Sequence, residues 1–328
     1  ALEWLDISRT AIHETALGAV SCDRTYSEGG GYVYIHECPN LETLLCNNNA
    51  MNSLGLRQCS KLKHVEARGM NGNSYIMCDN GTNTGNINFY ANGADGKSNT
   101  IEYFDVSDSG FSGVGVASAC ETSAIKTLIL DGNPLGGYTS GGTAVAGINL
   151  RNGLTADDCR TPDLETLSAV GCEDLAEVNV NYCTKLASVD LTGDEKIEKL
   201  YMMNCVGLTA VPALDAPTVL EELMCGYNTS LSDLDVSSYT GLTLLNCQND
   251  NIAELDLDSN LALARLYASN NLIEELDIPS EDIIDVVVDN NGMFRLDVGT
   301  APYLTNLDFS NNHICAIDLS DAGTLLSS

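Results

Sequence analysis

Basic side chains are scarce in this sequence of 328 residues. It has 15 Lys and Arg against 46 Asp and Glu, which gives a formal net charge of -31 at pH 7. Nucleic acids and anionic membrane surfaces would be repelled by such a field, so we expect neither as a partner. Cations and basic proteins would be attracted, although an acidic surface can also serve solubility alone.

Long apolar runs and the common catalytic motifs are also missing. No stretch approaches the roughly 18 consecutive apolar residues of a membrane-spanning helix, so we expect no membrane insertion. The sequence has no GxSxG, HExxH, P-loop or dinucleotide-binding motif. We therefore predict that the protein is not an enzyme and has no catalytic residues and no cofactor. With Trp4 as the single tryptophan and five phenylalanines, the core is expected to be aliphatic.

Patterns that bind metals are absent too. The 13 cysteines include no CxxC pair, and most of them follow the repeat described below, so we expect buried thiols. The four histidines fall in distant parts of the chain: His13, His36, His64 and His313. Asp79 and Asp95 lie in Asn- and Gly-rich stretches, but neither stretch matches an EF-hand loop. We predict no metal site and leave calcium binding open.

What the sequence does contain is a repeat of about 21 residues. Similar phrases begin 21, 21 and 20 residues apart, at Leu242, Leu263, Ile284 and Leu304. Each copy carries two apolar phrases with the alternation of a strand, such as Leu245 and Cys247 in the first copy. One copy cannot bury its leucines alone, so neighbouring copies must stack at the strand spacing of about 4.8 Å.

Asparagine pairs end the first phrase of several copies. The second members of these pairs are Asn271, Asn291 and Asn312. An amide side chain has two donors and an acceptor, so it can turn inward and satisfy backbone groups where the chain bends out of the strand. We interpret these asparagines as structural.

The repeat covers most of the chain. We predict one domain over residues 1–328, with irregular insertions near 70–100 and 136–162, where Asn, Gly and Ser indicate turns. In the first insertion Ile87 and Phe89 are expected to keep a strand. After the second, the strand resumes at Val145 or at Leu164. Because the pattern runs from residue 2 without an evident cap, we expect either preceding sequence or an end-to-end self-contact.

The phrase LxxLxxLxCxxNxLxxLDLSxN, legible over residues 220–319, resembles the bacterial leucine-rich repeat proteins, and among them the internalin-like surface group. LEELMCGYNTSLSDLDV from Leu220 and LTLLNCQNDNIAELDL from Leu242 carry the resemblance. It implies a curved, right-handed leucine-rich repeat solenoid that is mostly β, with a parallel concave sheet and few or only 3-10 helices on the convex side. It also implies a non-enzymatic binding scaffold at the bacterial cell surface or outside the cell.

The resemblance places the residues that flank the buried strand positions on the exposed face of the sheet. Counting back from Leu242 in half-units, we expect the Glu177 phrase to follow the Thr127 phrase in that sheet. Most of the exposed residues are small and polar, but one region combines aromatic, apolar and basic side chains, as interface hot spots do. The predicted partner-binding residues are Lys199, Tyr201, Met203, Glu222, Met224, Asn246, Arg265, Tyr267 and Val287.

Three uses of this scaffold remain open. The main hypothesis is recognition of, or adhesion to, a protein partner through the concave sheet. Glycan binding on the same face is the second, with tyrosines stacked on sugar rings. The third is a structural spacer within a larger surface protein.

Overall fold

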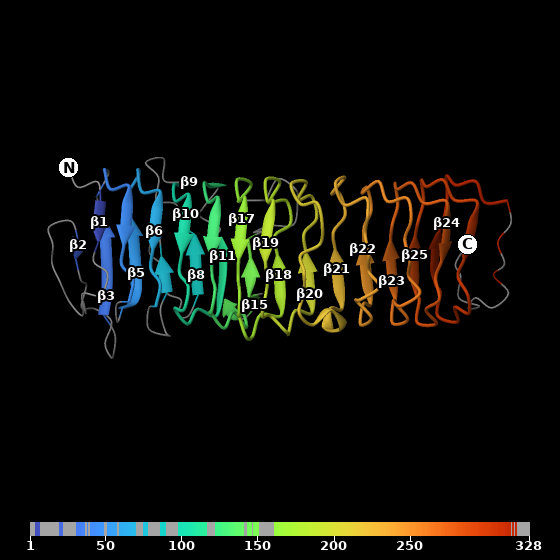
Figure 1. Cartoon of the computed structure of the whole chain (residues 1–328), viewed down its shortest axis with the longest axis horizontal. Coiled ribbons are helices and arrows are strands. Elements are labelled where there is room, and N and C mark those ends of the chain that lie inside the picture. The colour runs from blue at the N-terminus through green and yellow to red at the C-terminus, as the bar shows by residue number, and fades with distance from the viewer. Residues whose placement is uncertain are drawn as a thin grey trace. The chain divides into compact units, whose positions relative to one another are not determined.

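A computed structural model describes residues 4–6, 20–21, 31–36, 38, 40–48, 51–57, 59–69, 75–77, 86–89, 98–116, 122–140, 143–145, 147–150, 161–315, 317 and 319. These residues form short, mostly parallel strands that recur with the period of the repeat and stack on one another (Figure 1). They include the 3-10 turn η2 (Pro217–Val219) but no α-helix, and so no helix able to pass through a bilayer. The fold is therefore the predicted leucine-rich repeat solenoid, built almost entirely of strands.

The chain divides into two compact units, Ala1–Asp194 (unit 1) and Glu195–Ser328 (unit 2). The prediction of one domain over residues 1–328 stays a prediction.

Unit 1 contains a seven-stranded parallel sheet with one strand from each turn. The middle residues of neighbouring strands pair with one another, and Leu44, Phe104 and Leu128 point inward with 1% exposure or less. The strands in order are β1 (Trp4–Asp6), β4 (Thr43–Leu45), β6 (His64–Glu66), β10 (Tyr103–Asp105), β13 (Thr127–Ile129), β17 (Thr166–Ser168) and β19 (Ser188–Asp190).

A second sheet of unit 1 is built from the other phrase of each turn. It buries a further row of aliphatic side chains, among them Ile35, Leu54 and Val114, each fully buried. Apart from the antiparallel β2, its strands are parallel. They are β2 (Val20–Ser21), β3 (Gly31–His36), β5 (Met51–Arg57), β7 (Tyr75–Met77), β8 (Asn86–Phe89), β11 (Gly113–Val116), β16 (Ile148–Asn149) and β18 (Glu177–Asn179).

The two insertions keep the solenoid in register. Ile87 and Phe89 lie in β8, which confirms the strand expected in the first insertion. Val145 belongs to an antiparallel hairpin, and the seven-stranded sheet resumes only after Leu164, with β17. The short strands here are β9 (Ser98–Asn99), which pairs with β12 (Thr122–Ser123), and β14 (Tyr138–Ser140), which pairs with β15 (Thr143–Val145).

The expected order of strands across the second insertion is wrong. Thr127 pairs with Thr166 in β17, whereas Glu177 lies in β18 of the second sheet and pairs with the strand β16. Both phrases of a turn alternate like strands, and Leu164, Leu175 and Leu186 follow one another every 11 residues. Counting half-units therefore cannot tell which phrase belongs to which sheet.

Unit 2 repeats the arrangement with greater regularity. The strands of its main sheet pair in register, and Leu245 and Leu266 at their centres are fully buried, as expected, while Leu307 in the last strand is half-buried. The strands are β20 (Lys199–Tyr201), β21 (Glu222–Met224), β22 (Leu244–Asn246), β23 (Arg265–Tyr267), β25 (Asp285–Val287) and β27 (Asn306–Asp308), with β24 (Glu275–Asp277) and β26 (Arg295–Asp297) paired on the opposite side.

In one copy of the repeat, the first buried residue lies one position earlier than predicted. Ile283 is fully buried, whereas Ile284 is 41% exposed. Its backbone N–H donates to the oxygen of Ala264, as the residue before a strand does in neighbouring turns. Two successive isoleucines fit the pattern equally well, so the sequence could not decide between them.

The inward asparagines are confirmed. Asn271 donates through Nδ2 to the backbone oxygens of Cys247 (2.8 Å) and Ala268 (3.0 Å). Its Oδ1 accepts the backbone N–H groups of Asp250 and Ile252, both at 3.0 Å. One side chain thus satisfies four buried backbone groups and ties two turns together.

The first asparagine of each pair has a left-handed backbone conformation. Asn270, Asn290 and Asn311 have φ values of 58°, 55° and 55°, in the left-handed region that asparagine tolerates better than most residues. This conformation turns the chain out of the strand, so that the second asparagine of each pair enters the interior. In each pair, the first asparagine therefore bends the chain, and the second acts as a clamp that hydrogen-bonds two neighbouring turns.

The cysteines at the second apolar position of the strand are buried, as predicted. Cys46, Cys225 and Cys247 are each fully buried. Cys225 and Cys247 occupy neighbouring turns and carry free thiols. Burial raises the pKa of both thiols well above its ordinary value and raises the pKa of Cys172 to about 12. A thiol held in its neutral form is a poor nucleophile, so these cysteines act as small apolar core residues.

Candidate partner-binding face

The nine predicted partner-binding residues lie on one side of the main sheet of unit 2. Eight of them are the first or third residues of β20, β21, β22, β23 and β25, and Met203 follows β20. Arg265 is exposed and most others are half-buried, but Asn246 is only 7% exposed and offers little contact surface. We call this surface the sheet face: Lys199, Tyr201, Met203, Glu222, Met224, Leu244, Asn246, Arg265, Tyr267, Asp285 and Val287.

In-register pairing arranges the sheet face in two rows. One row of neighbours runs Lys199, Glu222, Leu244, Arg265 and Asp285. The other runs Tyr201, Met224, Asn246, Tyr267 and Val287. The first row is therefore charged except for Leu244, and in the second row each tyrosine has an apolar neighbour, Met224 or Val287.

Carboxylates on the next strand hold both tyrosines in place. Tyr201 donates through its hydroxyl to Glu222 Oε2 at 2.5 Å, and Lys199 Nζ lies 3.3 Å from the other oxygen of that carboxylate. Tyr267 donates to Asp285 Oδ2 at 2.6 Å. That hydrogen bond, with burial, raises the pKa of Tyr267. The rings are therefore fixed before any partner arrives.

Large apolar side chains are also exposed in the turns that lead into this sheet, and the sequence prediction missed them. Leu261 precedes β23 and is 60% exposed, Ile284 precedes β25, and Tyr303 precedes β27 with 59% exposure. Each lies outside the stretch in which apolar and polar residues alternate as in a strand. An apolar residue in such a position could have indicated an exposed apolar side chain.

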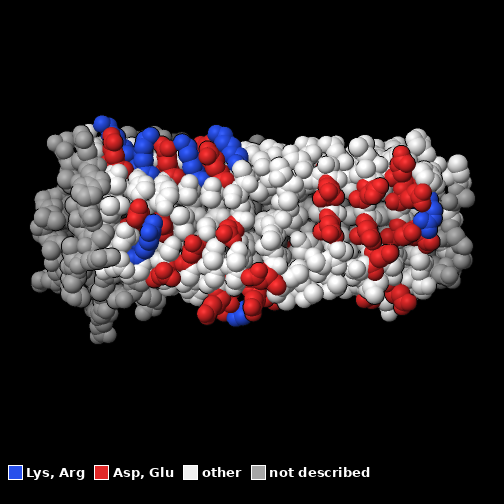
Figure 2. Space-filling view, viewed as in Figure 1, with Lys and Arg blue, Asp and Glu red and all other residues white. Residues whose placement is uncertain are grey.

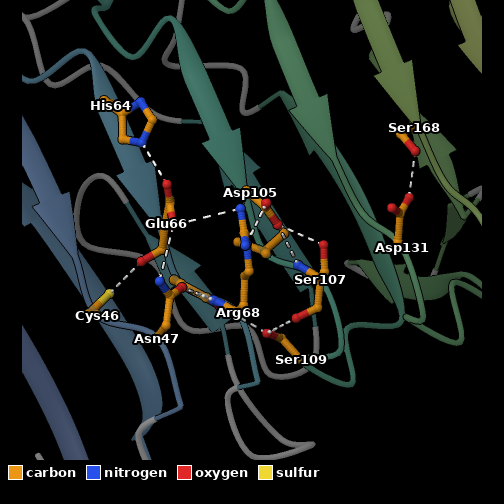
Figure 3. Close-up of polar contacts among 12 residues, drawn as sticks. Cys46, Asn47, His64, Glu66, Arg68, Asp105, Ser107, Ser109, Asp131 and Ser168 are labelled. Atoms are coloured by element: carbon orange, nitrogen blue, oxygen red, sulfur yellow. Dashed lines mark hydrogen bonds and ion pairs between the residues drawn. The ribbon is translucent and has the colours of Figure 1, made fainter. Parts of the chain in front are cut away.

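Unit 1 presents a polar network on its seven-stranded sheet (Figure 3). The carboxylate of Glu66 accepts a hydrogen bond from Asn47 Nδ2 (3.1 Å) and lies 3.0 Å from His64 Nε2. Burial opposes ionisation, but these contacts and the nearby Arg68 hold the pKa of Glu66 below its ordinary value. The His64 and Tyr103 rings stack in parallel with centroids 4.4 Å apart.

Arg68 neutralises a buried carboxylate at the centre of this network. Its Nε donates to Asp105 Oδ2 at 2.6 Å, and the Asp105 residue is 2% exposed. The other oxygen of Asp105 accepts the Ser107 hydroxyl at 2.6 Å. The charges of the network pair with one another, so we assign it a structural role.

Replacing Arg68 with alanine is expected to lower the free energy of unfolding by about 2 kcal/mol, because Asp105 would keep a buried charge without its cation. Chemical denaturation of the full chain measures the loss. Lys63→Ala is the matched control, because Lys63 is 62% exposed and forms a surface ion pair with Glu102 (2.7 Å) worth less than about 1 kcal/mol. Equal losses for the two variants would contradict the role given to Arg68.

Surface ion pairs join several turns of unit 1. Glu102 lies between Lys63 (2.7 Å) and Lys126 (2.8 Å), and Lys185 lies 2.6 Å from Asp163. Figure 2 shows basic and acidic side chains alternating in a row over unit 1. Hydrogen bonds from Lys126 and Lys63 lower the pKa of Glu102. Each of these three lysines thus pairs with a carboxylate of another turn.

The side of unit 2 that carries β24 and β26 is strongly acidic, as the grouped Asp and Glu side chains in Figure 2 show. Arg295 stands among them, 2.7 Å from Asp277, 3.6 Å from Glu275 and 3.5 Å from Asp297. A shallow hollow of about 230 Å³ beside it is lined by these strands and by residues 255–258. Within the described part of the chain, no three His, Cys, Asp or Glu residues have the geometry of a metal site.

No family model matches the sequence, and no curated protein does. Among solved structures, the chain is similar to the functional domain of InlJ from Listeria monocytogenes, which includes a cysteine ladder, with 17% identity and a TM-score of 0.33 over 88% of this chain and 57% of that one. A leucine-rich repeat protein of Leptospira interrogans shares 15% identity, with a TM-score of 0.30 over 83% of this chain and 61% of that one.

YopM from Yersinia enterocolitica shares 13% identity, with a TM-score of 0.41 over 99% of this chain and 90% of that one. The chain therefore spans less than two thirds of the InlJ and Leptospira chains and most of YopM. At these identities the likeness concerns the fold.

Proposed function

We propose that the protein is a non-enzymatic binding scaffold and that the sheet face of unit 2 binds a protein partner. The observation that carries the proposal is the pair of tyrosines fixed by hydrogen bonds to Glu222 and Asp285. Tyrosines that are already ordered lose little conformational entropy on binding, and tyrosine is enriched at binding hot spots. Met224 and Val287 beside them supply apolar contact area.

The charge of unit 2 indicates the charge of the partner's contact surface. Unit 2 contains four basic residues, Lys196, Lys199, Arg265 and Arg295, against 22 Asp and Glu. Such a field speeds the approach of a positively charged surface and slows that of a negative one. We therefore propose a protein partner whose contact surface is basic at its rim and apolar or aromatic at its centre.

The proposed location follows from the resemblance of the repeat phrases to the internalin-like surface group. We propose that the protein acts at the cell surface or outside the cell. The resemblance is carried by the phrases from Leu220 and Leu242, whose strands β21 and β22 pair in register.

The partner can be sought by screening the full chain against arrays of purified proteins and of glycans. For a protein identified in this way, Tyr201→Ala and Tyr267→Ala are each expected to weaken binding at least tenfold, as truncation of a hot spot does at about 1.4 kcal/mol or more. Phe294→Ala is the control, because Phe294 is 54% exposed but precedes β26 on the opposite side of the unit.

Three results would contradict the proposal. Binding to the identified partner that is unchanged in both tyrosine variants would remove the sheet face as the site. If the affinity does not fall as the salt concentration rises, the proposal that the partner's contact surface is basic is wrong. Binding to glycans alone would favour the alternative in which the tyrosines stack on sugar rings.

A further inference from the structure

The inward asparagines of unit 2 follow a strict hydrogen-bonding rule. In the regular turns each amide Nδ2 donates to two backbone oxygens, one three residues before it and one in the preceding turn. Where two asparagines follow one another in neighbouring turns, the oxygen between them accepts both amides. The oxygen of Ala268 receives Asn271 and Asn291, both at 3.0 Å, and that of Val288 receives Asn291 (3.1 Å) and Asn312 (3.0 Å).

One turn breaks this rule, because an aspartate takes the place of the asparagine. Asp250 follows Asn249, which has a φ of 64°, and it is fully buried. Its Oδ1 accepts the backbone N–H of Asn228 at 2.6 Å, and its own N–H donates to Asn271 Oδ1 at 3.0 Å. The position in the ladder is therefore the same, although the side chain has no N–H to give.

Because Oδ1 of Asp250 accepts a backbone N–H as the amide oxygen of Asn271 does, we infer that Oδ2 takes the place of the amide nitrogen. Oδ2 is buried and has no hydrogen-bond partner. By the rule of the ladder, it faces the backbone oxygens of Cys247, three residues earlier, and Cys225, in the preceding turn. Each of these oxygens accepts one amide, from Asn271 (2.8 Å) and Asn228 (2.6 Å), where Ala268 accepts two. An ionised Oδ2 and a backbone carbonyl oxygen are both acceptors and repel each other. Only a proton on Oδ2 allows a hydrogen bond between them.

The surroundings of Asp250 offer no counter-charge. The titratable groups that face it are the buried thiols of Cys225 and Cys247, which are neutral near pH 7. No ion pair joins Asp250 to a basic side chain within the described residues. Burial raises the pKa of Asp250 to about 7, although the Asn228 N–H opposes that rise. Desolvation thus acts in the same direction as the hydrogen-bond geometry.

We propose that Asp250 is a proton-dependent clamp of the ladder, which holds the turns of Asn228, Asp250 and Asn271 together while its carboxyl is protonated and loosens them when the proton is lost. The inference concerns the fold of unit 2 and is independent of what the sheet face binds. It makes the stability of this segment sensitive to pH near neutrality.

The sign of the pH dependence follows from the two states. The folded pKa of Asp250 lies above that of an unfolded aspartate, near 3.9, so the folded chain holds the proton more tightly. The stabilisation is complete below about pH 4, and it is lost as the pH rises through about 7. At one factor of ten per pKa unit, the unfolding equilibrium constant of the wild type should rise on the order of a thousandfold over this range from Asp250 alone.

Asp250→Asn tests the inference, because it installs the residue used at 228, 271, 291 and 312. Chemical unfolding of the full chain is measured between pH 4 and 8.5 for the wild type and for this variant. At pH 8 the variant should be the more stable, and its curve should lack the part of the pH dependence that Asp250 contributes. Asp256→Asn is the control, because Asp256 is exposed on the opposite side of the unit and should leave the pH profile unchanged.

Parallel pH profiles for the wild type and Asp250→Asn would overturn the proposal. Infrared spectroscopy provides a second measurement that does not require unfolding. At pH 5.5 the wild type should show the C=O stretch of a buried carboxylic acid, which disappears by pH 8.5 and is missing in Asp250→Asn. If this band is also missing from the wild type at pH 5.5, Asp250 is ionised and the proposal fails.

Discussion

Replacing Asn271 with leucine is expected to lower the free energy of unfolding of the full chain by about 5 kcal/mol. Leucine has nearly the shape of asparagine but no polar atoms, so the oxygen of Cys247 and the N–H groups of Asp250 and Ile252 would lose their side-chain partner. The oxygen of Ala268 would keep only Asn291 of its two amide donors. A buried backbone group without a partner costs about 1 to 3 kcal/mol. Leucine also occupies the space in which water could replace the lost bonds.

Denaturation with urea, followed by circular dichroism, measures the effect. Asn306→Leu serves as the matched control, since Asn306 is exposed and donates one side-chain hydrogen bond, to Asp285 (2.6 Å). We expect that variant to lose less than about 1 kcal/mol. A loss of similar size in both variants would show that the ladder is not the reason for the effect at Asn271.

Replacing Gly147 with alanine is expected to destabilise the chain by about 3 kcal/mol, a large value for one added methyl group. A Cβ atom at Gly147 would lie 2.0 Å from the backbone oxygen of Leu135 and 3.0 Å from a methyl carbon of Leu175. The first contact is with backbone, which cannot swing aside. Gly147 also accepts the N–H of Val114 at 2.8 Å, so a shift would disturb the pairing of β11 with β16.

A glycine with open space around it provides the comparison. In Gly292→Ala the new methyl group would come no closer than 3.7 Å to any atom, so we expect a change of less than about 0.5 kcal/mol. Thermal or chemical unfolding of both variants decides the question. If Gly147→Ala were as stable as Gly292→Ala, the close approach of Leu135 to β16 would be wrong.

The period of the repeat was sufficient to predict the solenoid. Leucines such as Leu245 and Leu266 recur with strand alternation and cannot be buried by one turn, so stacking was the one arrangement that hid them. The assignment of phrases to sheets was not predictable in the same way. At 11-residue spacing, Leu164 and Leu175 look alike, and only the hydrogen bonds of β17 and β18 separate them.

The candidate site was predictable in position and not in detail. Alternation places Tyr201 and Tyr267 outside, because their neighbours Leu200 and Leu266 must be inside. That each tyrosine is fixed by an acid one strand further on depends on register, which links residues 21 and 18 positions apart. The role of Asp250 was missed for a chemical reason, since aspartate after asparagine looks like any exposed acidic turn.

The repetition of the same clamp contacts also bears on how such a chain can change its length. Because Asn271 and Asn291 contact their neighbours in the same way, the gene could gain or lose the codons of one complete turn and still join matching edges. Duplication by unequal recombination would then lengthen the protein without turning any leucine toward water. Loss of a single codon within a strand would move the residues that follow it in that strand to the opposite face.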